Sequence, residues 1–185
     1  MTLRIIAGKF KGRSLKTPQG PSTRPTQGML REAVFNICQN EIGEARFLDL
    51  FAGSGAMGLE ALSRGATHAT LVESNRSALA CIKENIRTLE AALQISLLPV
   101  QAERAISMLA KQKALFDIIY VDPPYDTPLT QLLDALLPLL APQATLFIEE
   151  RHDPKKPHKI HCPPGLLLKD TRRFGIALLT IFRCT

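Results

Sequence analysis

Between residues 45 and 150 the sequence alternates between short apolar runs and longer segments with helical spacing, and this alternation limits the possible folds more than any other feature. Strands are expected at residues 45–52, 68–73, 95–100, 116–121 and 144–150, and helices at residues 57–65, 75–92, 102–113 and 128–140. Such an order favours an α/β fold in which helices cover both faces of a mostly parallel sheet. Residues 165–184 are typical of two further strands joined by a charged turn, which would add an antiparallel edge and complete a seven-stranded sheet.

The first 45 residues precede this alternation, and we expect them to form an appendage to a main domain of residues 46–185. LRIIAG (residues 3–8) and RSLKTP (residues 13–18) indicate two short strands joined by a turn with Phe10 at its tip. Thr26 is expected to cap a helix that runs to about Asn40.

The appendage is strongly basic, because no acidic residue precedes Glu32, and the whole chain has a net charge of +6. Its basic residues are Arg4, Lys9, Lys11, Arg13, Lys16, Arg24 and Arg31. This density of one sign favours contacts with phosphate groups. A solvated basic face without a ligand is the alternative explanation.

A glycine-rich segment, DLFAGSGAMG from Asp49, lies where the first expected strand turns into the first expected helix. Gly53, Gly55 and Gly58 have the G-x-G-x-x-G spacing that lets a ligand approach the backbone at a helix N-terminus, although small residues there also help a helix to pack on a sheet. Glu73 ends the next strand, about twenty residues on, where an acid binds ribose hydroxyls. The three features together predict a nucleoside-containing cofactor.

Asp49 indicates which cofactor this is. An acid beside the glycine loop suits a ligand that carries a cationic amino acid, and S-adenosylmethionine is such a ligand. The alternative is that Asp49 only caps a turn.

DLFAGSGAMGLEALSRGA, VESN and VDPPY, in this order, resemble a class I S-adenosylmethionine-dependent methyltransferase of Rossmann-like fold. The segments RIIAGKFKGRSLKTP and RPTQGMLREAVFN narrow the resemblance to the RsmD-like family. The similarity covers almost the whole chain and is strongest at residues 3–75 and 121–125. It implies methyl transfer to the exocyclic N2 of a guanine, G966 in the family, in 16S rRNA of the small ribosomal subunit.

The resemblance also assigns roles in DPPY. Pro123 and Pro124 take the chain out of the sheet in a stiff turn, which would fix the residues on either side. Asp122 and the carbonyl of Pro123 would accept hydrogen bonds from the target amine and make its lone pair available to the methyl group. Tyr125 would stack on the base, an interaction worth about 1 to 3 kcal/mol.

Further contacts follow from the resemblance position by position. The cofactor would be bound by Asp49, Phe51, Ala52, Gly53, Gly55, Glu73, Asn75, Gln101, Ala102 and Asp122. Gln101 departs from the family pattern, which often has Asp or Asn there for the adenine amine. The RNA would be bound by Arg4, Lys9, Lys11, Arg13, Arg24 and Arg31.

The family pattern has an acidic and then a basic residue after R-P-T, where this chain has Gly28 and Met29, so the first helix could begin later or contact RNA less. For Arg31 the alternative to an RNA contact is an ion pair with a nearby acid that fixes the appendage.

Several other classes of protein are not expected. No apolar run is long enough for a transmembrane helix, and the charged start of the chain is unlike a secretory signal. Four cysteines without a CxxC pair indicate free thiols in the cytoplasm. His158, His161 and Cys162 lack a fourth ligand at the usual spacing, so no zinc site is expected. Arg172, Arg173 and Phe174 could equally protect the sheet edge or contact substrate.

The sequence therefore predicts a monomeric enzyme that acts on rRNA within the small subunit. Three alternatives remain open. A DNA adenine-N6 methyltransferase also uses DPPY, but the chain has no room for a target-recognition domain. A protein glutamine methyltransferase resembles this chain but carries NPPY. A non-catalytic RNA-binding assembly factor could retain the cofactor pocket.

Overall fold

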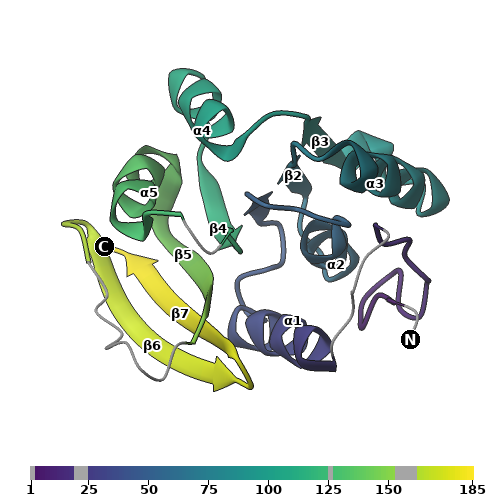
Figure 1. Ribbon diagram of the computed structural model, residues 1–185, viewed down its shortest axis with the longest axis horizontal. Helices are drawn as coiled ribbons and strands as arrows, with labels where there is room; N and C mark the ends of the chain where they lie inside the picture. The colour runs from purple at the N-terminus through teal and green to yellow at the C-terminus, as the bar shows by residue number, and fades with distance from the viewer. Residues whose placement is uncertain (1–2, 19–24, 125–126, 153–161) are drawn as a thin grey trace.

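The computed structural model describes residues 3–18, 25–124, 127–152 and 162–185, with the backbone alone for residues 25–27 (Figure 1). Its helices are α1 (Pro25–Ile37), α2 (Ala56–Ser63), α3 (Arg76–Thr88), η1 (Ala92–Gln94), α4 (Ala102–Lys111), α5 (Leu129–Leu136) and η2 (Leu137–Leu139). Its strands are β1 (Arg46–Asp49), β2 (His68–Val72), β3 (Ile95–Leu98), β4 (Phe116–Val121), β5 (Leu140–Arg151), β6 (Leu166–Phe174) and β7 (Ala177–Cys184). In the described ranges, no helix has the length and apolar character needed to span a bilayer.

The seven strands form one sheet in the order β3-β2-β1-β4-β5-β7-β6. Strands β1 to β5 are parallel, and β7 pairs antiparallel with both β5 and β6. The predicted fold class, a mostly parallel sheet with an antiparallel C-terminal hairpin, is confirmed. Because the order reverses between β1 and β4, the carboxyl ends of these two strands flank the crevice where α/β proteins bind ligands.

Helices cover both faces of the sheet, and each face has its own apolar core (Figure 1). On one face α1, α2 and α3 contribute Val34, Leu59 and Ile82, which pack with Phe47 and Phe147 of the sheet. On the other face α4 and α5 pack on alternate residues of the same strands. Successive strand residues point to opposite faces, so parity along a strand decides which core a side chain joins.

Several predicted boundaries were wrong, among them those of α1 and of the turn before β7. The helix α1 begins at Pro25 and ends at Ile37, so Thr26 lies inside the helix, and the possible later start does not occur. Proline at the first helical position loses no hydrogen bond, and its fixed φ suits a helix. The turn between the last two strands is formed by residues 175 and 176, and the expected charged turn belongs instead to the exposed strand β6.

Residues 3–18, the N-terminal arm, form a hairpin with less strand pairing than predicted. A single antiparallel bridge joins Arg4 to Ser14, and three flanking hydrogen bonds extend the pairing. The arm is held by hydrogen bonds to α2 and α3, and those to α2 include two to one buried carboxylate. Glu60 accepts hydrogen bonds from the N–H groups of Ile6 and Ala7 at 2.8 and 2.9 Å, and the N–H of Lys9 donates to the carbonyl of Ser63 at 2.7 Å.

Substitutions at two glycines of the arm can distinguish the effect of backbone conformation on stability from the effect of close packing. Gly8 and Gly12 both have φ of 81°, but a Cβ on Gly8 would lie 1.7 Å from the Ser63 carbonyl oxygen, whereas a Cβ on Gly12 would meet nothing within 4 Å. We expect Gly12→Ala to cost about 1 to 2 kcal/mol, the usual cost of this conformation for a side chain. Gly8→Ala should cost more and release the arm from α2. Urea unfolding and hydrogen exchange of residues 3–18 measure both effects, and equal losses in the two variants would show that the clash is irrelevant.

Candidate active site

The glycine loop between β1 and α2 has the geometry of a ligand-binding turn. Gly53 and Gly55 have φ of 55° and 79°, in the left-handed region that glycine adopts without strain. A Cβ on Gly53 would meet nothing within 4 Å, so this part of the backbone is open to a ligand. A Cβ on Gly55 or Gly58 would instead approach the side chain of Leu71. One glycine thus gives access to the backbone, and the other two allow α2 to pack on the sheet.

Glu73 lies where the sequence placed it, at the end of β2 beside the glycine loop. Its Oε2 accepts a hydrogen bond from the N–H of Gly53 at 2.8 Å, and its Oε1 accepts from the N–H groups of Ser74 and Asn75 at 2.8 and 2.7 Å. These three donors fix the carboxylate at the carboxyl edge of the sheet, where it can accept hydrogen bonds from hydroxyl groups.

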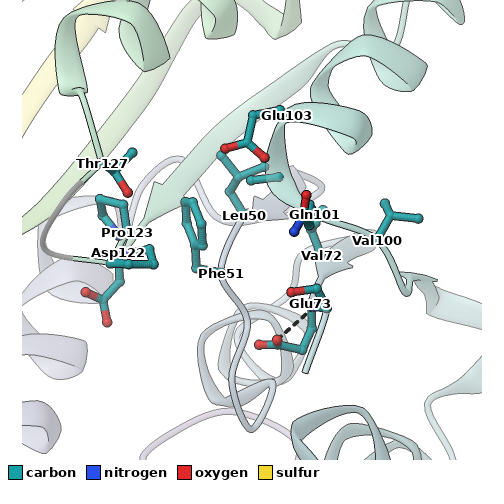
Figure 2. Close-up of a pocket in the computed structure, with 13 residues that line it drawn as sticks. Leu50, Phe51, Val72, Glu73, Val100, Gln101, Glu103, Asp122, Pro123 and Thr127 are labelled. Carbon is teal, nitrogen blue, oxygen red and sulfur yellow. Dashed lines mark hydrogen bonds between the residues drawn. The ribbon is translucent and has the colours of Figure 1, made fainter. Parts of the chain in front are cut away.

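A cleft of about 500 Å³ opens beside Glu73. Figure 2 shows Phe51 in its middle, with Glu73 and Gln101 on one side and Asp122 and Pro123 on the other. The remaining lining includes Leu50, Val72, Ser74, Val100, Ala102, Glu103, Pro124 and Thr127. A cleft that combines apolar side chains with acidic and amide groups suits a flat ring that carries a polar sugar.

The chain leaves β4 through Asp122, Pro123 and Pro124. The carbonyl of Pro124 accepts a hydrogen bond from the N–H of Thr127 at 3.0 Å, just before α5. Tyr125, the predicted stacking residue, lies outside the described residues.

A second, smaller pocket of about 170 Å³ adjoins the cleft. Asp122 and Phe51 line both spaces. Asp49, Tyr120 and Glu149 add polar groups to the second pocket, and Ala52, Gly53 and Ser54 bring the glycine loop to it. Asp122 therefore lies at the junction of the two pockets.

Asp49 is a fully buried acid of the site. It is 1% exposed, and neither of its carboxylate oxygens has a hydrogen-bond partner among the residues that the structure describes. Burial raises its pKa to about 8, with smaller contributions from the charges of Asp122 and Glu73, and the nearby backbone groups of Gly58 and Phe51 oppose the rise only in part. A buried carboxyl without a partner, beside an open backbone turn, favours a cationic ligand.

Asp122 and Glu149 form an acidic pair in the second pocket. Loss of water around the Asp122 carboxyl and the charge of Glu149 raise the pKa of Asp122, although part of this residue is exposed at the mouth of the cleft. Burial likewise raises the pKa of Glu149, while the hydrogen bond from the Tyr120 hydroxyl opposes the rise. Burial raises the pKa of Tyr120 well above its usual range, so Tyr120 remains a donor.

The sequence did not single out Tyr120 or Glu149. Both lie in strands that were predicted correctly, two residues after the core residues Ile118 and Phe147, and parity places them on the α1 face. An acid at the end of a buried strand was the available signal, as it was for Glu73.

Of the two predicted adenine-contacting residues, Gln101 lines the cleft and Asn75 caps a helix. Gln101 precedes α4 without a side-chain cap and lines the cleft, where its amide is available to a ligand. Asn75 caps α3, and its Oδ1 accepts hydrogen bonds from the N–H groups of Ser77 and Ala78 at 2.9 and 3.1 Å. This cap explains Asn75 without an adenine contact.

The basic residues of the N-terminal arm are partly engaged with the protein itself. Arg4 donates to the carbonyl of Gly12, Lys9 to the side chain of Gln94, and Arg13 to the carbonyl of Thr88, while all three remain exposed. Lys11 is also exposed, and Arg24 lies outside the described residues.

Arg31, by contrast, is 6% exposed, and its Nη2 donates to the carbonyl of Arg4 at 2.6 Å. Its Nε lies 3.7 Å from Glu60 Oε2. These contacts favour the structural explanation for Arg31, an ion pair that fixes the arm.

No group of three or more potential metal ligands gathers within the described ranges. Cys162 is exposed, and His158 and His161 lie outside those ranges. All four cysteines are free thiols.

Comparison with known proteins gives a family and a set of relatives. The family described as "Conserved hypothetical protein 95" matches residues 3–183. "Putative rRNA methyltransferase YlbH" of Bacillus subtilis is 42% identical over 155 residues, which cover 82% of this chain and 83% of that protein. "Ribosomal RNA small subunit methyltransferase D" of Escherichia coli K12 is 40% identical over 150 residues, which cover 80% and 74%. The solved "Putative methyltransferase yhhF from Escherichia coli" superposes with a TM-score of 0.84 at 32% identity, over 100% of this chain and 98% of that one.

Proposed function

The chain belongs to the family described as conserved hypothetical protein 95, and from this premise we propose that it transfers a methyl group from S-adenosylmethionine to the N2 amine of a guanine in small-subunit ribosomal RNA. The names of the relatives from B. subtilis and E. coli support the methylation of ribosomal RNA. Within ribosomal RNA, the proposed target atom is N2 of a guanine, G966 of 16S rRNA. This choice rests on the resemblance carried by VDPPY and the N-terminal segments.

The observation that carries the proposal is the position of Asp122 at the junction of the two pockets. The cleft beside Glu73 and Gln101 suits the adenosine part of the cofactor, and the buried carboxyl of Asp49 suits its cationic amino acid. The amino acid would occupy the part of the second pocket lined by Asp49 and the glycine loop. A target base in the part lined by Tyr120 and Glu149 would then present its amine to Asp122, beside the place where the methyl group must pass.

The protein's own contribution is to hold and orient the amine. Bound S-adenosylmethionine supplies an already activated methyl group, so positioning is the main requirement. Asp122 and the Pro123 carbonyl accept hydrogen bonds from the two N–H groups and hold these hydrogens out of the ring plane, so that the nitrogen lone pair leaves conjugation with the ring and is available to the methyl group. Tyr125 is assigned the stacking role. When the N–CH3 bond has formed, the nitrogen must lose one proton, and Asp122 can accept it because its pKa is raised.

The proposed RNA contacts come from the appendage, residues 1–45. Arg4, Lys9, Lys11 and Arg13 lie exposed on the arm, and Arg24 belongs to the same segment. Basic side chains of this kind bind phosphates and set register, whereas the base is read in the pocket. The base has to leave any stack before it enters that pocket.

The direct test is transfer of labelled methyl groups to small subunits from cells that lack the endogenous enzyme. Naked rRNA, DNA and a protein release factor serve as parallel substrates. Label recovered as N2-methylguanine in 16S rRNA is the expected result. Label only in DNA or in protein would overturn the assignment, and cofactor binding without transfer to any substrate would indicate a non-catalytic assembly factor.

Cofactor affinity should depend on pH through Asp49. With a pKa of about 8 in the free protein, this carboxyl is largely protonated at lower pH, and a cationic ligand favours its ionised form. Binding must therefore release a proton, and the affinity should rise by up to about tenfold per pH unit between about pH 6 and pH 8. Calorimetry in two buffers of different ionisation enthalpy measures the released proton. Asp49→Asn should bind weakly and lose most of this pH dependence, and an unchanged slope would contradict the role of Asp49.

A further inference from the structure

The second pocket contains more acceptors than the handling of one amine requires. Asp122 and Glu149 both line it, and Tyr120 donates its hydroxyl hydrogen to Oε2 of Glu149. Asp49, the third acid of this pocket, is assigned to the cofactor. Glu149 has no part in the transfer of the methyl group to the amine.

The position of Glu149 is set by the sheet. Asp49, Tyr120 and Glu149 belong to the neighbouring strands β1, β4 and β5, and Asp49 pairs directly with Tyr120 while Tyr120 pairs with Phe147. Paired residues share a face, and Glu149 follows Phe147 by two, so all three side chains point to the α1 face. Glu149 is held by two strand pairings, with Ile148 before it pairing to Val121 and Glu149 itself pairing to Leu179 of β7.

Two carboxylates in so small a space repel each other unless donors lie between them. Asp122 and Glu149 line the same pocket of about 170 Å³, and the charge of Glu149 contributes to the raised pKa of Asp122. Tyr120 satisfies one oxygen of Glu149, so Oε1 can accept a hydrogen bond from a ligand. The guanidinium of Arg31 also lines this pocket but is engaged with Glu60 and the carbonyl of Arg4. The pocket therefore favours a ligand edge with adjacent donors.

Guanine presents such an edge, because its N1–H lies next to its N2 amine. Adenine presents an unprotonated N1 beside its amine, and this lone pair would face a carboxylate. Resting on the proposed function, we propose that Glu149 is a base-specificity residue: it accepts a hydrogen bond from N1–H of the target guanine while Asp122 accepts one from the N2 amine. Tyr120 is a positioning residue that keeps the Glu149 carboxylate turned to the base.

A flipped base is read by hydrogen bonds to its Watson–Crick edge, and a site that leaves a buried polar group unpaired rejects the wrong base. The analogue 2-aminopurine isolates the proposed contact, since it retains the N2 amine but has an unprotonated N1. The wild-type protein should methylate guanine about 10- to 100-fold faster than 2-aminopurine at the same nucleotide.

The test compares small subunits reassembled with guanine or 2-aminopurine at the nucleotide that the wild-type protein modifies. Glu149→Gln exchanges the carboxylate for an amide that can donate to the unprotonated N1, so the ratio of guanine to 2-aminopurine kcat/KM should fall by about tenfold or more. Glu150→Gln is the matched control, because Glu150 is the next residue of β5 and points to the opposite face. This control should keep the wild-type ratio.

Tyr120→Phe supplies a second measurement that does not change the charge of the pocket. It should slow the reaction on guanine but keep the preference for guanine, because the carboxylate remains. A ratio unchanged in Glu149→Gln, or lost equally in Glu150→Gln, would overturn the role of Glu149. Absence of transfer to guanine by the wild-type protein would instead overturn the proposed function, so the two failures are distinguishable.

Discussion

Asp122→Ala should lower the rate of methyl transfer by about 10² to 10³, which is the usual loss when one well-placed hydrogen-bonding group is removed from a reacting centre. Without the carboxylate, the amine loses an acceptor, and its lone pair returns to conjugation with the ring. The affinity for S-adenosylmethionine should change little, because Glu73, Gln101 and Asp49 remain. Single-turnover kinetics and calorimetric titration separate the two quantities.

Asp122→Asn is the matched variant, since the amide keeps one oxygen acceptor in almost the same place. We expect a smaller loss than for alanine, together with a weaker pH dependence of the chemical step, because the amide does not titrate. If Asp122→Ala abolished cofactor binding as well as transfer, the acceptor role would be wrong or incomplete.

The second large effect, on stability, is expected at Glu60 of α2, which accepts hydrogen bonds from the backbone of the N-terminal arm. Its side chain is fully buried, accepts two backbone hydrogen bonds from the arm and pairs with Arg64 at 2.8 Å and Arg31 at 3.7 Å. Glu60→Ala leaves the buried Arg31 without its counter-charge and two N–H groups without their acceptor. The free energy of unfolding should fall by about 3 to 5 kcal/mol. Urea denaturation followed by circular dichroism measures the loss.

Glu84 provides the control for Glu60. It also joins the arm to a helix, because it pairs with Lys16 and with Arg87, but these contacts lie at the surface. Exposed ion pairs contribute little to stability, so Glu84→Ala should change the unfolding free energy far less than Glu60→Ala. Similar losses in the two variants would show that burial does not set the importance of these pairs.

Local patterns were enough to single out three residues that the structure brings together in the candidate site. Asp49, Gly53 and Glu73 follow directly from a strand, a tight turn and a second strand, each of which has a short-range signal. The structure brings them together because consecutive parallel strands end at the same edge of a sheet. The fold class could be predicted for the same reason.

The remaining features depend on contacts between distant residues, which a sequence pattern does not record. Whether Arg31 faces RNA or Glu60 depends on how the arm packs on α2. The specificity proposed for Glu149 depends on the register of β5 against β4, where a shift by one residue would turn its side chain to the opposite face. Asn75 is the exception, since its capping role could have been read from the helix that follows it.

The fixation of the arm has a consequence for the order in which the chain folds during synthesis. Ile6 bonds to Glu60 across 54 residues, Lys16 to Asn85 across 69, and Lys9 to Gln94 across 85. The arm leaves the ribosome before these partners, which follow several seconds later at ordinary rates of about 5 to 20 residues per second. Its basic residues therefore spend that interval without their native contacts, and the arm cannot reach its final place until residues up to Gln94 have been made.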